Sequence, residues 1–290
     1  MTAFTGNKSG IGITNSLQEL ISPIVTEALF VSSEMSIMPN LVKTYSIPAN
    51  AGKVLNIPIY GTETAIALTE GTDIVGTAGD LTINTSSQSI TLAEAGLMTL
   101  VTDMTLNHAT SNVVADLGKI FGEAIARKHD QSLTALFGSF TNSIGAPQDE
   151  LTVEALFKAY STLKSAAVPG PYFGVFHPKA IYNIKKTMTN TFNPQSNVNV
   201  VNQAMSEGYV GRIAGIDIFE SSNVVEDSAT SVTNAVFSRD ALGLAVSSDL
   251  KIATQRDESM RGTEVVATTV YGVSLLHTSY GVKIIGDNQL

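Results

Sequence analysis

The sequence predicts an α+β fold whose subunits assemble with one another. One observation behind this prediction is a long β arm, within residues 46–103, that leads directly into a long amphipathic helix. Another is a central section, residues 149–245, in which helices and strands alternate. A third is the low charge, because Asp, Glu, Lys and Arg make up 15% of the chain, against about 25% in typical soluble domains.

The β arm is the strongest sign of assembly. Residues 53–60 are predicted to form one strand and residues 89–101 its returning partner, while the residues between them are rich in Gly, Thr and Asp. A two-stranded arm is at best marginally stable alone in water. No nearby segment of the sequence offers it a cover, and we therefore expect a neighbouring copy of the same chain to cover it.

The polar composition supports the same expectation. In place of charged residues, the chain carries Thr, Ser, Asn and Gly. These residues hydrogen-bond well and cost less free energy than charged ones to bury between subunits. The alternative interpretation of this composition is a β-rich surface protein that is simply neutral and polar.

The N-terminal residues 1–45 are predicted to begin irregularly and then to become helical. Residues 1–15 are rich in Gly, Thr and Asn. Ser16 and Glu19 have the spacing of a capping box, which marks the start of a helix. Residues 47–52 then form a turn that leads into the β arm.

The segment from Met104 to Phe140 is predicted to be one long helix. Apolar side chains recur on one of its faces, and charged side chains occupy much of the other. From Leu106 to Phe137 this helix would extend about 48 Å at 1.5 Å per residue. A helix of that length would serve as a structural strut.

The central section and the C-terminal end complete the predicted fold. Pro178 stands where it can open a helix, and His177 is placed to cap that helix. Residues 263–285 form one apolar, β-branched run, predicted as one or two long strands that pack on the long helix. The elements of the central section are a helix, a strand, a second helix, a hairpin and two strands, at residues 153–163, 172–176, 178–188, 211–219, 235–237 and 242–246.

The sequence contains no recognisable catalytic, metal-binding or cofactor-binding motif, so we predict no enzyme activity and no cofactor. Cysteine is absent, and with it thiolate nucleophiles and Cys-based metal sites. Phosphate-binding loops and the Gly-x-Ser-x-Gly nucleophile motif are also absent. No two of the four histidines have the spacing of a zinc helix; they are His108, His129, His177 and His277.

Charge and hydropathy argue against two further classes of partner. The net charge is −9 and the chain has no Lys/Arg run, so strong direct binding to nucleic acid is not expected. A signal peptide and an apolar run of the ~20 residues that span a membrane are both missing. We expect a chain that is made in the cytoplasm and has no membrane partner.

The order of these elements resembles that of tailed-bacteriophage major capsid proteins with the Hong Kong ninety-seven type fold. The resemblance runs from about Ser16 to Gly286 and rests on several phrases in order rather than on any one motif. The phrases are Ala51-Gly52-Lys53-Val54-Leu55-Asn56-Ile57-Pro58, Leu68-Thr69-Glu70-Gly71-Thr72-Asp73-Ile74, Phe176-His177-Pro178, Gly211-Arg212-Ile213-Ala214-Gly215-Ile216, Phe237-Ser238-Arg239-Asp240-Ala241-Leu242 and Tyr271-Gly272-Val273.

The resemblance implies that the chain has five parts within a phage capsid version of the α+β fold. These parts are an N-terminal arm, an extended β-hairpin or E-loop with flanking strands, a peripheral domain with a spine helix, a central α/β axial domain, and long closing strands that return to the peripheral domain. In that order they cover residues 1–45, 46–103, 104–148, 149–245 and 246–290.

The resemblance also implies a structural protein that self-assembles into an icosahedral or related shell around double-stranded DNA. Its copies would form hexamers and pentamers of the virion, assembled in the bacterial host cytoplasm, and would enclose the DNA without binding it strongly. A portal, decoration proteins and a separate scaffolding protein are the other implied partners. The scaffold is expected to be separate because only about fifteen residues precede the first predicted helix.

One property of some family members is not carried over, and two other functions stay open. Lys53 lies near the base of the arm rather than its tip, so a Lys–Asn isopeptide crosslink is not expected. The first alternative function is an encapsulin-type nanocompartment shell, in which the same fold holds a protein cargo. The second is a β-rich phage tail or adhesin subunit, which would predict repeats or an aromatic sugar-binding patch; the chain has no Trp and 7% aromatic residues.

Charged residues of the arm are candidates for contacts between subunits. The chain has no Lys or Arg between Gly61 and Asp103, so the arm is acidic. Two arginines just before the closing strands are the predicted cationic partners in an adjacent subunit. The six candidates are Glu63, Glu70, Asp73, Asp80, Arg256 and Arg261.

Overall fold

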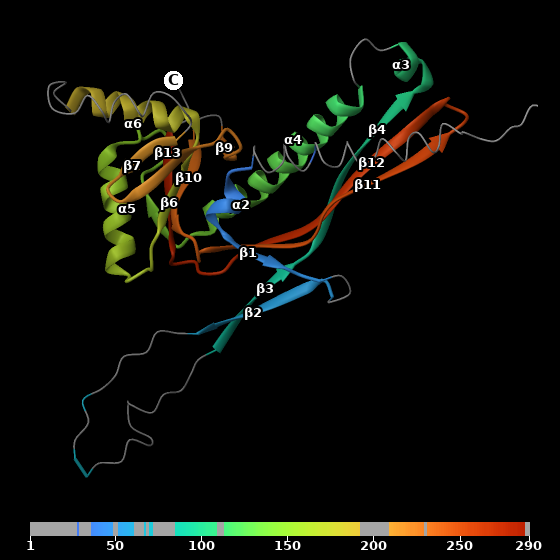
Figure 1. The fold of residues 1–290 in the computed structure, drawn as a ribbon. Helices are drawn as coiled ribbons and strands as arrows, with labels where there is room; N and C mark the ends of the chain where they lie inside the picture. Colours follow the sequence, from blue (N-terminus) through green and yellow to red (C-terminus); the bar gives the residue numbers. More distant parts are fainter. Residues whose placement is uncertain are drawn as a thin grey trace, which may run out of the picture.

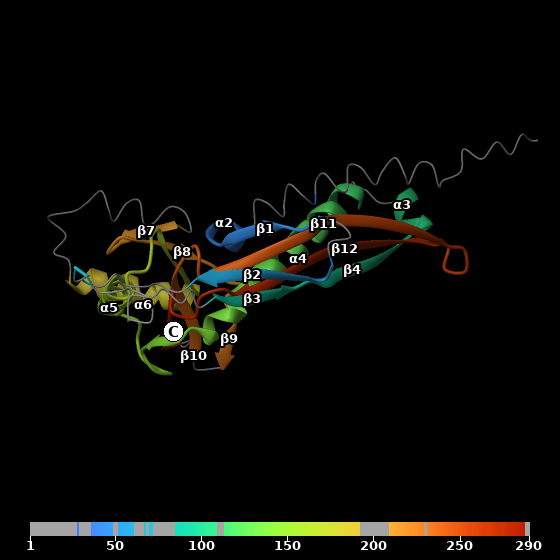
Figure 2. The same ribbon diagram turned by 90° about the horizontal axis from the view of Figure 1, so that it is seen from below.

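Two sheets and a projecting arm make up the computed structural model of the chain (Figure 1). A seven-stranded sheet with two helices forms one end, and a four-stranded sheet extends away from it beside the long helix α4 (Val113–Thr134) (Figure 2). The predicted helix start at Ser16 and most of the predicted arm tip lie outside the described residues. The structure describes residues 28, 36–48, 52–60, 67, 70–71, 85–108, 113–191, 209–228 and 231–287.

The seven-stranded sheet has the strand order β5-β13-β10-β6-β8-β7, and β9 pairs with β10. Every residue of the central strand β10 is buried, as is usual for a strand that is covered on both faces. The strands are β5 (Asn142–Ile144), β6 (Tyr172–Phe176), β7 (Tyr209–Ile213), β8 (Ile216–Glu220), β9 (Glu226–Ser228), β10 (Ser231–Ser238) and β13 (Gly281–Asp287).

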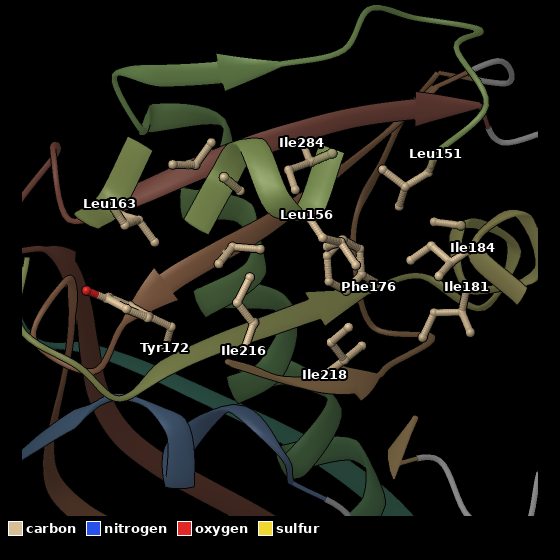
Figure 3. Packing of buried hydrophobic residues seen from close by; sticks show 14 of the residues in the cluster. Leu151, Leu156, Leu163, Tyr172, Phe176, Ile181, Ile184, Ile216, Ile218 and Ile284 are labelled. Carbon is tan, nitrogen blue, oxygen red and sulfur yellow. The ribbon is translucent and has the colours of Figure 1, made fainter. Parts of the chain in front are cut away.

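Helices α5 (Val153–Ser165) and α6 (Pro178–Thr191) cover one face of this sheet. Figure 3 shows Leu156 of α5 and Ile181 of α6 beside Phe176 of β6, all within one buried apolar cluster. The other face is covered by the 3-10 helix η1 (Ala135–Ser139), which continues α4. There the ring centroids of Phe137 and Phe237 lie 5.6 Å apart.

The elements predicted between residues 153 and 237 are confirmed. The helix from residue 153, the strand at 172–176, the helix opened by Pro178 and the hairpin of β7 and β8 are all present. His177 caps α6 as predicted, because its Nδ1 accepts a hydrogen bond from the Lys179 backbone N–H at 3.3 Å.

The four-stranded sheet has the order β1-β11-β12-β4. On one of its faces, Phe121 of α4 packs in a cluster with Val265 and Ala267. Strand β11 is much longer than the predicted strand at 242–246. The bounds are β1 (Lys43–Ser46), β4 (Ala93–Thr102), β11 (Leu242–Asp257) and β12 (Gly262–Leu275).

The predicted C-terminal run of residues 263–285 is divided between the two sheets. β12 belongs to the four-stranded sheet, whereas β13 pairs with β10 in the seven-stranded sheet. The predicted closing strands of residues 246–290 therefore belong to two sheets rather than one. The apolar side chains continue through both strands, so their pattern does not reveal where the chain changes sheets.

The chain crosses between the sheets through α4 and η1 and, in addition, through two short links that lie side by side. Residues 239–241 join β10 to β11, and residues 276–280 join β12 to β13. The Leu276 N–H donates a hydrogen bond to the Ala241 carbonyl at 2.8 Å, and the Ser238 N–H donates one to the Tyr280 carbonyl at 3.0 Å. The two links therefore connect the two sheets covalently and are also hydrogen-bonded to each other.

The predicted helix from Met104 to Phe140 is not one helix. The structure has α3 (Asp103–His108), then α4, whose 22 residues extend about 33 Å at 1.5 Å per residue, and then η1. The sequence just before α4 is Thr110-Ser111-Asn112. These residue types favour helix starts over helix interiors. The prediction of one continuous helix followed the apolar stripe instead of this local sequence.

The β arm has a different pairing from the predicted one. β2 (Val54–Tyr60) pairs antiparallel with β3 (Thr85–Thr91), whereas β4 turns away to pair with β12. The single predicted partner at residues 89–101 is therefore two strands. The expectation that nothing in the chain covers the arm is also wrong at its base, because Ile90 is fully buried against Ala245 and Leu276.

Candidate assembly surfaces

A hollow on the described surface contains carboxylates that are held in ion pairs. Within the described ranges, no group of three or more metal-ligating side chains is placed to hold an ion. One surface hollow beside the start of α5 contains Glu150 and Glu154. Each carboxylate is held by a lysine at 2.8 Å, Glu150 by Lys186 and Glu154 by Lys158. The hollow is therefore an ion-paired surface.

Among the helices in the described part of the chain, none combines the length and the apolar character needed to cross a bilayer.

The distal end of the four-stranded sheet is closed by a two-pronged ion pair. The guanidinium of Arg256 contacts the carboxylate of Asp103 at 2.5 and 2.7 Å, and its Nε lies 3.2 Å from Glu258. The hydrogen bond from Arg256 lowers the pKa of Asp103, and the nearby charge of Arg261 acts in the same direction. The pair joins the end of β11 to the start of α3 and so fixes the distal end within one subunit.

This pairing bears on the predicted role of the two arginines. Arg256 was expected to face an acidic arm of another subunit, yet its guanidinium is already held by Asp103 of its own. Arg261 is exposed and has a left-handed backbone, with φ of 47°, in the turn between β11 and β12. Its backbone carbonyl accepts a hydrogen bond from the Asp103 N–H at 3.0 Å.

The acidic candidates of the arm are only partly described. Glu70 is exposed, beside Gly71. Glu63, Asp73 and Asp80 lie outside the described residues. Within one subunit, as far as it is described, Glu70 forms no ion pair with either arginine, so any such contact would have to join two subunits.

The face of the four-stranded sheet turned away from α4 carries an apolar row. Because Val265 and Ala267 pack toward α4, the intervening Val266 points to the opposite face. Its register partners are Ala253 on β11 and Met98 on β4. Met98 is 60% exposed. This row is apolar surface that another chain could bury.

A buried carboxylate that the sequence reasoning missed joins three segments. Asp130 of α4 is fully buried. It accepts hydrogen bonds from Ser36 Oγ at 3.0 Å, from the Met38 N–H at 3.2 Å and from Asn223 Nδ2 at 3.2 Å. Its spacing from Ala126 already places it on the apolar stripe of the helix, which is the signal that could have revealed it.

The neighbouring residue, His129, ties α4 to the closing strands. Its ring meets the ring of Tyr271 edge to face, at 4.3 Å between centroids, and Ser132 Oγ lies 2.8 Å from the Tyr271 hydroxyl. Burial lowers the pKa of His129. The expectation that the C-terminal run packs on the long helix is confirmed for β12.

Comparison with known proteins gives one family and a consistent set of folds. The model of a family described as phage capsid protein matches residues 85–284. No curated protein sequence matches the chain.

Three solved structures illustrate the similarity of fold. The capsid structure of the cyanophage P-SCSP1u has a TM-score of 0.66 and 18% identity, covering 88% of this chain and 89% of that one. A chain from Mycobacterium phage Che8 has a TM-score of 0.66 and 17% identity over 86% and 90%. A virus-like particle from Pyrococcus furiosus has a TM-score of 0.62 and 13% identity over 91% and 98%. The fold is thus shared over most of each chain although few residues are identical.

Proposed function

The chain belongs to the phage capsid protein family, and from that premise we propose that it builds an icosahedral or related shell around double-stranded DNA. As a major capsid protein with the Hong Kong ninety-seven type fold, it is a structural subunit that forms a shell with copies of itself. The encapsulin-type and tail or adhesin alternatives are not favoured by this membership.

The observation that carries the proposal is the arm of β2 and β3. Apart from Ile90, the residues of these strands whose exposure is described are exposed or only half-buried. A two-stranded hairpin gains little stability alone. We therefore propose that the arm is an E-loop, which lies across a neighbouring subunit within a hexamer or pentamer.

Charge supports a more specific form of this contact. The arm is acidic, and Arg261 is exposed at the distal end of the four-stranded sheet. We propose that Glu63, Glu70, Asp73 or Asp80 of one subunit approaches this end of the next. Arg261 is the better placed partner, because Arg256 would have to share the guanidinium that Asp103 already holds.

The remaining partners follow from the same premise. The net charge of −9 favours a shell that encloses DNA without binding it strongly. A portal, a separate scaffolding protein and decoration proteins are the proposed further components of assembly. The proposed site of assembly is the bacterial host cytoplasm, and the product is the virion capsid.

Electron microscopy and nuclease protection test the proposal together. The chain is expressed alone and with candidate scaffolding proteins encoded beside it, and the purified product is imaged. We expect closed particles, capsomers or sheets, with nuclease-resistant DNA in particles from infected cells. Particles that hold one protein cargo and no DNA would favour the encapsulin-type function. A stable monomer at high concentration under every condition would overturn shell formation itself.

A further inference from the structure

The arm meets its own subunit through one fully buried side chain. Within residues 54–59 and 86–91, Ile90 alone is buried, whereas Ser86 to Ser89 are exposed. Leu55, which is directly opposite Ile90 in the β2–β3 register, is half-buried in the same cluster. The base is closed by a hydrogen bond of 2.8 Å from the Leu92 N–H to the Lys53 carbonyl.

The site that receives Ile90 combines residues of little or no side chain with Ile47 and Leu276, which belong to the same buried cluster. Gly243 and Ala245 of β11 lie beside Gly272 of β12, and Ala245 and Gly272 are register partners. A Cβ at Gly272 would lie 2.9 Å from Ile90 Cγ2 and 2.4 Å from the Thr91 carbonyl oxygen. A Cβ at Gly243 would lie 3.1 Å from Ile90 Cδ1. We call Gly243, Ala245 and Gly272 the glycine socket.

The glycines of the socket have a packing reason. Glycine inside a strand weakens the strand, and it often marks a place where another backbone approaches closely. Here that backbone is β3, whose Thr91 carbonyl passes over Gly272. Both glycines have ordinary negative or extended backbone angles, since neither is among the residues with positive φ. Close approach, not turn geometry, is therefore what requires them.

We propose that Ile90 and the glycine socket form a joint that sets the direction of the arm. Strands β2 and β3 project from the four-stranded sheet (Figure 1), and Ile90 lies near the end of β3, so a small rotation at Ile90 becomes a larger displacement at the other end, where Tyr60 pairs with Thr85. The joint would thus decide where the arm meets a neighbouring subunit. Ile90 is a positioning residue in this proposal, which rests on the proposed role of the arm in shell assembly.

The glycines give the proposal a ranked test. Gly272→Ala places a Cβ against backbone, which cannot move aside without shifting β3, so it should disturb the joint strongly. Gly243→Ala meets only the ends of the Ile90 and Leu276 side chains, so it should disturb the joint weakly. Ile90→Ala empties the socket. Val54→Ala is the matched control, because Val54 is a β-branched residue of the same arm that is 50% exposed.

The direction of the arm can be measured without any assembly. The chain has no cysteine, so spin labels can be placed at Ser87→Cys on the arm and Lys119→Cys on α4, both exposed positions. Double electron–electron resonance spectroscopy then gives the distribution of distances between the two spin labels in the unassembled full chain. We expect the single narrow distribution of the parent to be lost in Ile90→Ala and Gly272→Ala, and kept in Gly243→Ala and Val54→Ala.

Particle images of the same unlabelled variants complete the test. Variants that lose the narrow distribution should give fewer closed particles and more irregular sheets than Val54→Ala. An unchanged distribution in both Ile90→Ala and Gly272→Ala, with circular dichroism showing a folded subunit, would overturn the joint. A broadened distribution with normal particles would overturn its positioning role. Failure of the parent itself to assemble would count against the proposed function, while the resonance measurement would still decide the joint.

Discussion

Burial and hydrogen bonding shift the pKa of the Asp130 carboxyl group in opposite directions. Burial raises its pKa above the ordinary 3.8, and the hydrogen bonds from Asn223, Ser36 and Met38 offset that rise only in part. The folded chain therefore keeps this proton at pH values where the unfolded chain has lost it. The stability contributed by protonation is complete below 3.8 and is lost as the pH rises through the raised pKa.

We predict that Asp130→Asn removes this part of the pH dependence. Asn stays neutral, so the free energy of unfolding of the parent should fall relative to that of the variant as the pH is raised from about 4 to about 7. Urea unfolding of the unassembled chain, followed by circular dichroism, measures the difference. Asp116→Asn, an exposed change on the same helix, is the matched control for replacing an aspartate by asparagine in α4. Parallel curves for the parent and Asp130→Asn would refute the prediction.

At the scale of elements, the register of β2 and β3 shows where the outer part of the arm can be deleted. Tyr60 and Thr85 are register partners at the ends of β2 and β3, so an Asn-Gly turn can join them directly. We predict that replacing residues 61–84 with this turn leaves the subunit folded, because the helices and the two larger sheets are formed by residues outside this segment. Closed shells should be lost.

Circular dichroism and electron microscopy separate the two outcomes of that deletion. The helical signal should match the parent, since α4, α5 and α6 are untouched. Normal shells from the shortened chain would show that these residues are not needed between subunits. Loss of the helical signal would show instead that the segment contributes to the fold of its own subunit.

Helices and strands whose start is marked by local residues could be predicted from the sequence. The points at which a strand changes its pairing partner could not. Pro178 and His177 mark the start of α6 in the sequence itself, and the structure places the helix there. By contrast, the strand predicted at residues 89–101 is two strands, because the chain changes its pairing partner at Leu92 while the apolar pattern continues. Pairing with β12 is decided by residues far away in the chain.

The candidate contact residues show the same limit. Their charges are evident in the sequence, but the ion pair of Arg256 with Asp103 joins residues 153 positions apart. Nothing local in either segment indicates that pairing. The glycine socket depends on distant partners in the same way, so only the folded chain reveals it. For Asp130, the place on the apolar stripe of α4 is visible in the sequence, but its hydrogen-bond partners Ser36 and Asn223 are not.

At the scale of the whole molecule, charge should affect assembly more than folding. An exposed ion pair contributes little to one subunit, but a shell repeats each contact at every equivalent boundary. We predict that Glu70→Lys or Asp73→Lys impairs shell formation at low salt without unfolding the subunit. Arg261→Glu should restore assembly in at least one pairing, and added salt should reduce the differences.

Two controls sharpen the charge test. Glu94→Lys makes the same reversal at an exposed position of β4, outside the arm, and should assemble like the parent. Arg256→Glu should loosen the distal end of its own subunit, because Asp103 loses its partner, so it cannot serve as a simple rescue. If every single reversal assembles like the parent at low salt, the proposed contact does not exist.

The two links between the sheets have a mechanical consequence. A closed container filled with polymer stretches its wall, and in each subunit that tension must pass from one sheet to the other. The segments 239–241 and 276–280 run in opposite directions and are tied to each other by backbone hydrogen bonds. We expect tension between the sheets to act on these hydrogen bonds together with the packing of α4 and η1. The boundary between the two sheets should therefore resist being pulled apart within each subunit.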